Sequence, residues 1–239
     1  MVHHTIFIYV SYFTTMKSRF PFSITLVFLW ILGLASQLQA HSVWIEDTPE
    51  GRLILRFGEI GDDYEKSPGH LDDLRFPLSW MRKADDKTAA IALQKNSDHY
   101  LLLNAASKEG ACAETDYPVL AAKDKPGRKP FFYARWHVIG EPVPGPSMVL
   151  DLVPTSTPGT VRLYLRGKPQ PGAKIVVHTP KGKDQEITTD GEGNAHFELA
   201  QSGLYILTCA HQRETIAGFA AGLSYEMVSH NCSLAWRQP

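Results

Sequence analysis

The sequence predicts an all-β protein, with two sandwich-like β domains after a cleaved signal peptide. Three observations predict it. Short runs of β-branched, aromatic and aliphatic residues alternate with Gly, Pro, Asp and Asn, sustained helical periodicity is scarce, and an apolar leader stands near the amino terminus. We expect residues 1–40 to be the signal peptide, 41–154 the N-terminal β domain, and 155–239 a C-terminal Ig- or transthyretin-like β-sandwich.

The leader has the three parts of a secretory signal peptide. Basic residues precede an apolar run at 24–35, and a polar stretch then ends in the small residue Ala40. We expect cleavage after Ala40, so that His41 becomes the first residue of a periplasmic or secreted protein. An uncleaved membrane anchor is the alternative. Both Met1 and Met16 fit as the first residue translated.

Strands are predicted wherever a short apolar or alternating run is bounded by turn residues. A short helix is expected at 70–74, and the Pro-rich stretch 154–159 is expected to separate the domains. The Asp-Gly and Gly-Asn pairs of 190–194 predict a tight hairpin joining the strands on either side. The predicted strands are 42–46, 52–57, 89–94, 99–104, 131–138, 148–153, 161–165, 174–178, 186–189, 195–199, 204–209 and 227–236.

Composition and motifs exclude several classes of function. A formal net charge of -1 provides no basic field, so no nucleic-acid partner is expected. The sequence contains no G-x-S-x-G nucleophile elbow, no H-E-x-x-H metalloprotease motif, no phosphate-binding loop and no dinucleotide-binding motif. The protein is therefore predicted not to be an enzyme. The three cysteines show no C-x-x-C spacing. Cys209 and Cys232 fall on predicted strands, where a disulfide and two buried thiols both remain open.

Several segments of the mature chain resemble known families. Residues 41–46, 132–136 and 225–230, together with the leader, resemble the exported bacterial NikM-like, nickel-uptake-related family. Residues of about 160–211 resemble the carboxypeptidase-regulatory or transthyretin-like β-sandwich module. The first resemblance implies a periplasmic β protein linked to transition-metal uptake, with a metal ion and a membrane transporter as partners. No membrane helix is predicted after the leader, so a soluble binding role is implied.

An amino-terminal histidine can chelate a metal ion in a way that internal histidines cannot. The free α-amine and ring Nδ1 of His41 would close a six-membered chelate on nickel, cobalt or copper, metals that nitrogen donors suit. His137 and His230 are predicted to complete the metal site, with His70 as a third candidate. The carboxylates of the loop 59–65 favour a solvated loop over a site for a hard cation.

The sequence thus predicts an exported soluble protein that binds a divalent transition metal for uptake or handling. A non-catalytic adhesion or carbohydrate-binding module is the first alternative, in which exposed aromatic residues make the contacts. A copper-dependent oxidative enzyme that uses the same amino-terminal chelate is the second.

Overall fold

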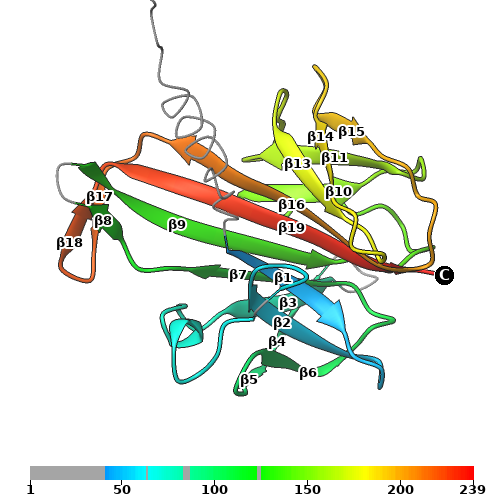
Figure 1. Cartoon of the computed structure of the whole chain (residues 1–239), viewed down its shortest axis with the longest axis horizontal. Coiled ribbons are helices and arrows are strands. Elements are labelled where there is room, and N and C mark those ends of the chain that lie inside the picture. The colour runs from blue at the N-terminus through cyan, green and yellow to red at the C-terminus, as the bar shows by residue number, and fades with distance from the viewer. Residues whose placement is uncertain (1–40, 63, 83–86, 123–124) are drawn as a thin grey trace, which may run out of the picture. The chain divides into compact units, whose positions relative to one another are not determined.

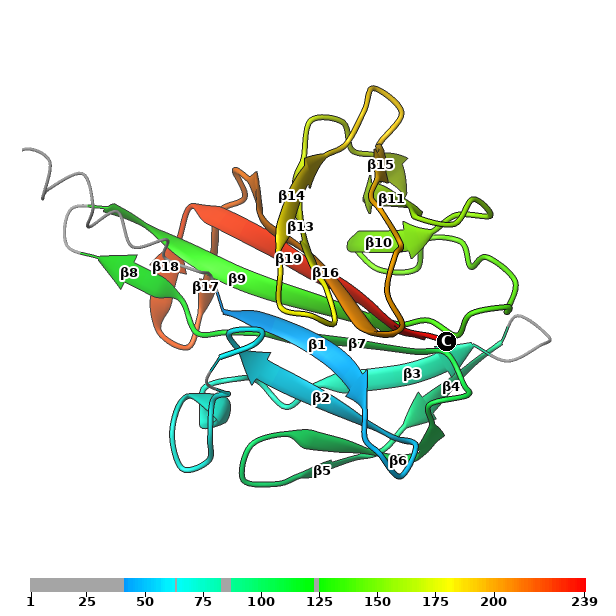
Figure 2. The same cartoon turned by 45° about the vertical axis from the view of Figure 1, so that its right-hand side comes forward.

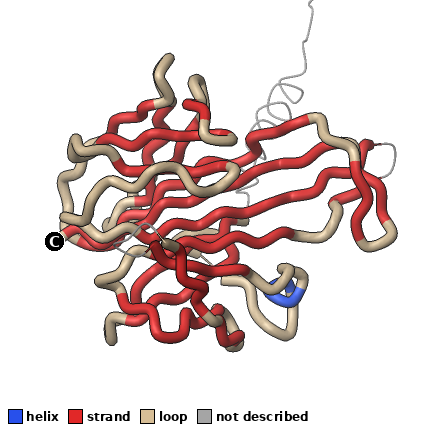
Figure 3. The backbone as a smooth tube through the Cα atoms, turned by 180° about the vertical axis from the view of Figure 1, so that it is seen from behind, coloured by secondary structure: helices blue, strands red, loops and turns tan. Residues whose placement is uncertain are grey.

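The all-β class is confirmed. The computed structural model describes residues 41–62, 64–82, 87–122 and 125–239, and Figure 3 shows strands throughout them, with one short helical turn. This turn is a 3-10 helix, η1 (His70–Asp72), where a short helix was expected. No helix in these ranges is long and apolar enough to cross a membrane. The predicted signal peptide, 1–40, lies outside the described residues.

Three of the described strands are twelve residues long, and the others have between two and seven. In chain order they are β1 (Ser42–Asp47), β2 (Arg52–Gly58), β3 (Leu78–Arg82), β4 (Thr88–Ile91), β5 (Leu93–Lys95), β6 (Tyr100–Ala106), β7 (Ala111–Asp116), β8 (Leu120–Ala122), β9 (Lys125–Trp136), β10 (Leu150–Pro154), β11 (Thr160–Leu165), β12 (Lys168–Pro169), β13 (Lys174–His178), β14 (Gln185–Thr188), β15 (Asn194–His196), β16 (Gly203–Glu214), β17 (Gly218–Ala220), β18 (Leu223–Tyr225) and β19 (Met227–Gln238).

A nine-stranded sheet runs through the middle of the described chain. Its order is β14-β13-β16-β19-β9-β7-β3-β4, with β8 attached to β9. The long strands β9, β16 and β19 lie side by side at its centre in Figures 1 and 2. Strand β19 pairs in parallel with β9, which brings 227–235 beside 128–136. The two predicted domain ranges therefore share one sheet, within a single compact unit that contains 41–239.

Each face of this central sheet is covered by a smaller sheet. The sheet β1-β2-β6-β5 packs on one face and encloses a core that includes Trp44, Phe57 and Phe132. The sheet of β10, β11, β12 and β15 packs on the other face, around a core that includes Tyr133 and Leu234. Because both of its faces are covered, β19 is buried from Val228 to Trp236 without alternation.

A buried ion pair ties the second small sheet to the central sheet. The Arg135 guanidinium on β9 donates to both carboxylate oxygens of Asp151 on β10, at 3.0 Å and 2.5 Å, and Asp151 is fully buried. The backbone amides of Ser147 and Met148 donate to the same carboxylate. These bonds satisfy a charge that would otherwise be costly to bury.

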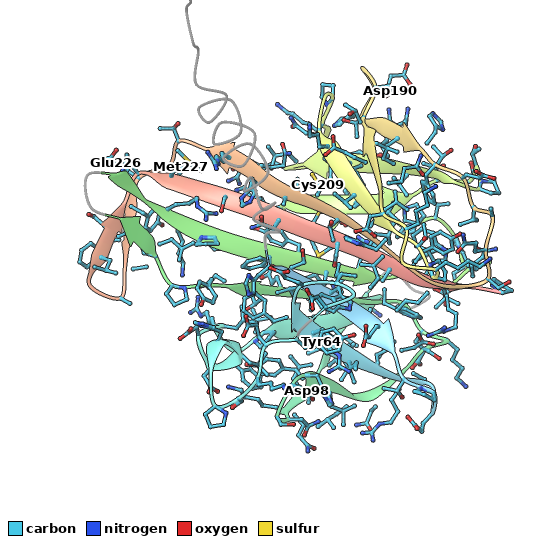
Figure 4. All side chains as sticks on the ribbon, viewed as in Figure 1. Tyr64, Asp98, Asp190, Cys209, Glu226 and Met227 are labelled. Atoms are coloured by element: carbon cyan, nitrogen blue, oxygen red, sulfur yellow. The ribbon has the colours of Figure 1, made fainter. Side chains whose placement is uncertain are left out.

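The turn at 190–194 forms, but the predicted hairpin does not. Asp190 Oδ1 accepts the backbone N–H groups of Glu192 and Asn194, and Asp190 marks the tip of this turn in Figure 4. The flanking strands pair elsewhere, β14 with β13 and β15 with β11. The turn therefore passes the chain from one sheet to the other, because turn chemistry fixes a local reversal and leaves the choice of strand partner open.

Cys209 and Cys232 lie directly opposite each other on β16 and β19, and both are buried free thiols. Of the two possibilities that the sequence left open, the structure contains the pair of thiols. Burial raises the pKa of the Cys232 thiol, which keeps it protonated and unreactive.

Candidate metal-binding rim and a buried histidine relay

The structure places the three predicted metal ligands at separate positions. The Ser233 hydroxyl donates to the Val43 carbonyl at 2.8 Å, so Ser233 faces β1 and the start of the described chain. His230 lies three residues earlier on the same strand and therefore points to the opposite face of the sheet. His137 follows the end of β9, whereas His230 is level with Phe131. These two positions are six residues apart along β9, or roughly 20 Å.

His41 lies at the edge of the first core, beside a carboxylate. Its Nε2 atom is 2.5 Å from Glu65 Oε1, and its ring centroid is 5.3 Å from that of Phe57. The His41 side chain remains 45% exposed. A carboxylate can only accept hydrogen bonds, so Nε2 carries the proton and Nδ1 of the neutral ring keeps its lone pair.

Backbone pairing holds both partners in place. The strand β1 pairs with β2 from Ser42 onward, which fixes the backbone next to His41. The Glu65 amide donates to the carbonyl of Phe57 at 2.9 Å, so the loop after β2 folds back against that strand. The neighbouring residue Tyr64 lies under the Arg56 guanidinium, 4.3 Å from the ring centroid, and Arg56 also binds Asp98 at 2.6 Å. Tyr64 and Asp98 are labelled in Figure 4.

A second histidine belongs to the same edge. Nδ1 of His70 donates to Asp73 at 2.9 Å, and the Tyr117 hydroxyl donates to the same carboxylate at 3.0 Å. The Tyr117 ring lies 5.7 Å from that of Phe57, which also contacts His41. We call this connected edge the His41 rim. Its members are His41, Glu65, His70, Asp73 and Tyr117.

Charge links the two halves of the rim. The hydrogen bond to Asp73 raises the pKa of His70, and the Glu65 carboxylate raises it further. Burial raises the pKa of Tyr117 to about 12, again with contributions from Asp73 and Glu65. The hydrogen bond from His70 lowers the pKa of Asp73. The rim is therefore an acidic, solvent-accessible edge that stabilises positive charge.

His230 occupies a different environment, in the middle of a hydrogen-bonded chain. Its Nε2 atom is 2.8 Å from Glu214 Oε2, and its Nδ1 atom is 3.1 Å from the Tyr133 hydroxyl. Arg166 binds Glu214 through two guanidinium nitrogens. The ring stacks on Phe131, at 5.8 Å between centroids, and its side chain is only 4% exposed. We call the series Arg166, Glu214, His230 and Tyr133 the His230 relay.

Burial controls the protonation of this relay. It lowers the pKa of His230, despite the opposing effect of Glu214, so the ring is neutral near pH 7. It raises the pKa of Tyr133, to which the Glu114 carboxylate also contributes. The hydrogen bonds from Arg166 lower the pKa of Glu214. Both ring nitrogens of His230 are engaged, so a metal ion would have to displace Tyr133 or Glu214.

His137 is half-buried beyond the end of β9, where its backbone amide donates to the Ala235 carbonyl at 2.9 Å. Burial and the nearby Arg135 charge lower the pKa of its ring. A neighbouring guanidinium disfavours a second cation at this position. Among the described residues, no three His, Cys, Asp or Glu side chains already converge as a metal site.

Sequence reasoning identified His70 and the loop that contains Glu65 only as lesser candidates. It missed Tyr117, Tyr133 and Glu214, which no motif marks. The loop 59–65 is rich in carboxylates, and that composition was a usable signal for a partner of His41. The partners of His230 carried no comparable signal, since Tyr133 lies 97 residues away in sequence.

No protein-family model matches the sequence, and no match to a curated protein is found. The resemblance to the NikM-like family therefore rests on the segments quoted above, and the function must be argued from the site.

Proposed function

We propose that this protein is exported and binds a divalent transition metal ion, nickel, cobalt or copper, through an amino-terminal His41, for metal uptake or handling. The observation that carries the proposal is the contact of His41 Nε2 with Glu65, at 2.5 Å. This contact fixes the tautomer in which Nδ1 has a lone pair. Nδ1 is the ring nitrogen that a chelate with the α-amine requires.

Cleavage after Ala40 would supply the second donor. The α-amine and Nδ1 of one histidine then bind the same ion, and Glu65 becomes the carboxylate that orients the ring. Histidine ligands in metal sites commonly have such a partner on the other nitrogen. The exposed fraction of the His41 side chain, 45%, leaves the ion a direct path from solvent.

The remaining coordination positions would be filled by water and by rim side chains. His70 is the imidazole of the rim, and Glu65 and Asp73 supply negative charge beside it. These acidic groups offset the charge of a divalent cation. Since His41 itself provides two donors, one further protein ligand would complete a site of ordinary affinity for nickel or copper.

Isothermal calorimetry with Ni²⁺ and Cu²⁺ tests the proposal on two forms of the protein. One begins at His41, and the other carries one extra alanine before it, which removes the free α-amine from the chelate. We expect the extended form to bind at least ~10-fold more weakly, or about 1.4 kcal/mol. Equal affinities would refute the amino-terminal chelate.

A matched control separates the site from the general histidine content. His196→Ala removes a histidine whose Nδ1 contacts Thr160, on the small sheet of β10, β11, β12 and β15. This substitution should leave the affinity for Ni²⁺ and Cu²⁺ unchanged. Mass spectrometry of the exported protein identifies its first residue. A first residue other than His41 would contradict the proposal.

A second candidate function is carbohydrate binding at the small sheet of β10, β11, β12 and β15. A pocket of about 500 Å³ lies there, and its lining includes Tyr164, Asn194, His196 and several threonine hydroxyls. An aromatic ring among hydroxyl and amide groups suits a sugar. Titration with neutral oligosaccharides, monitored by NMR, should shift the amides of Tyr164 and Asn194. Unchanged spectra at millimolar sugar would exclude this function.

A further inference from the structure

A separate pocket of about 380 Å³ opens beside the His230 relay, on the face of the central sheet opposite β1. Strands β7 and β9, which lie side by side in Figures 1 and 2, form its floor. Its walls are largely apolar. Its lining includes the apolar and aromatic residues Phe76, Leu78, Phe131 and Tyr133 and the charged residues Arg75, Glu114 and Asp116.

The apolar wall is open to solvent. Phe76 is 57% exposed and Leu78 is 63% exposed, although both are large hydrophobic side chains. Phe131 and Tyr133 add two more aromatic rings from β9. Such a wall favours a ligand with an apolar body, and aromatic rings also attract cations through their faces.

One carboxylate of the pocket lacks a basic partner. Asp116 is bound by Lys129 and, at 3.2 Å, by Arg75, so its charge is already matched by basic groups and it is not available to a ligand cation. Glu114 takes part in no ion pair within the described part of the chain. It lies opposite both Leu78 and Tyr133 in the strand register, and its charge acts on the Tyr133 phenol. Glu114 is therefore the carboxylate of this pocket that can still pair with a cationic ligand.

The His230 relay determines what Tyr133 offers to a ligand. Glu214 only accepts hydrogen bonds, so Nε2 of His230 carries the ring proton and Nδ1 is an acceptor. The Tyr133 hydroxyl must then donate its proton to Nδ1, at 3.1 Å. Its oxygen has only lone pairs left for the pocket. Tyr133 is consequently an acceptor, aligned with the negative charge of Glu114.

We infer that this pocket binds a protonated primary amine carried on an apolar, preferably aromatic, group. The ammonium would lie between Glu114 and the Tyr133 oxygen and donate to both. The apolar group would pack against Phe76, Leu78 and Phe131. A ligand hydroxyl in place of the ammonium would lack the charge that Glu114 attracts, and a ligand carboxylate at that position would be repelled by Glu114. This site is independent of the metal proposed for His41.

NMR titration of the full mature protein with three probes tests the inference. Phenethylamine, a protonated primary amine at pH 7, should shift the amides of Glu114, Phe131 and Tyr133. Its neutral analogue 2-phenylethanol should bind at least ~10-fold more weakly. The trimethylammonium analogue keeps the charge but has no N–H, so its affinity should lie between the other two. Equal binding of amine and alcohol would overturn the inference.

Two substitutions locate the interaction. Glu114→Gln should weaken phenethylamine binding about 10-fold and leave 2-phenylethanol unaffected. Tyr133→Phe should reduce the advantage of phenethylamine over its trimethyl analogue. Glu192→Gln, in the exposed turn at 190–194, is the matched control and should change nothing. Unchanged amine affinity in Glu114→Gln, with the folded state verified by its NMR spectrum, would overturn the assignment.

Discussion

His41 and His230 are two histidines in the same tautomer, yet their surroundings differ in what they leave the second ring nitrogen able to bind. Each has a carboxylate at Nε2, Glu65 at 2.5 Å and Glu214 at 2.8 Å, so each keeps a lone pair on Nδ1. In His230 the Tyr133 hydroxyl occupies that lone pair, and the side chain is 4% exposed. In His41 the side chain is 45% exposed. A carboxylate partner therefore orients a histidine ring, and whether Nδ1 is already hydrogen-bonded determines whether the ring can bind a metal ion.

The two surroundings also differ in what charge they tolerate. Burial lowers the pKa of His230, so added positive charge there is unfavourable. At the His41 rim, Asp73 and Glu65 raise the pKa of His70, so added positive charge is favourable. A divalent cation is therefore expected at the His41 rim and not at His230.

The largest expected effect is on the free energy of unfolding, and it distinguishes a fully buried carboxylate from a partly exposed one. Asp151→Ala leaves Arg135 buried without its partner, and we expect a loss of about 3–5 kcal/mol in the free energy of unfolding. Glu65→Ala, which removes a partly exposed carboxylate of the rim, should cost less than about 1 kcal/mol. Urea denaturation measures both. Similar losses for the two variants would remove the distinction between the regions.

Removing each histidine in turn separates stability from binding. His230→Ala leaves the buried Tyr133 hydroxyl without its acceptor and opens a cavity beside Phe131, so we expect a loss of about 2–3 kcal/mol. Its Ni²⁺ affinity, relative to the unaltered protein, should not change. His41→Ala should abolish the chelate and barely alter the midpoint of unfolding. The reverse pattern would move the metal site to the relay.

Glu65→Gln sharpens the assigned role of the carboxylate. The amide nitrogen and oxygen can both reach Nε2, so the variant no longer fixes the tautomer that exposes the Nδ1 lone pair. We expect Ni²⁺ affinity to fall about 10-fold, in the range typical of carboxylates that orient metal-bound histidines. Glu192→Gln serves as the control. An unchanged dissociation constant for Glu65→Gln would show that orientation of the ring is immaterial.

The smallest expected effect is on the pH dependence of stability. Burial lowers the pKa values of His137, His178 and His230 below 6.5. As the pH falls through 6.5, the unfolded state therefore takes up protons before the folded state does, and stability decreases. We expect Tm to be about 2–4 °C lower at pH 5 than at pH 7, which corresponds to about 1 kcal/mol. His230→Gln should flatten this slope, and an unchanged slope would mean that His230 is not buried in its neutral form.

Local patterns predicted much of the fold. The apolar runs within 42–46, 52–57 and 227–236 predicted β1, β2 and β19, because a short apolar run bounded by turn residues is typical of a buried strand. Pairing was not predictable in the same way. The parallel contact of β9 with β19 joins segments about a hundred residues apart, and the chain between them leaves no pairing signal in either strand.

The site shows the same division between local and distant information. His41 was predicted from the processing signal, which is local, and Glu65 lies in a loop only 24 residues away. The environment of His230 depends on Tyr133, which is 97 residues away and reaches it only through the pairing of β9 with β19. A sequence can thus predict a candidate histidine, whereas the hydrogen-bond partner of its second ring nitrogen depends on how the strands pair in the folded protein.

Paramagnetic broadening by Cu²⁺ tests the central claim most directly, because it locates the ion within the folded protein. One equivalent of Cu²⁺, added to the ¹⁵N-labelled protein that begins at His41, should broaden the amide signals of Ser42, Glu65 and His70. The signals of His137 and His196 should stay sharp. Broadening centred on His230, or spread evenly over all the histidines, would contradict a metal site at the His41 rim.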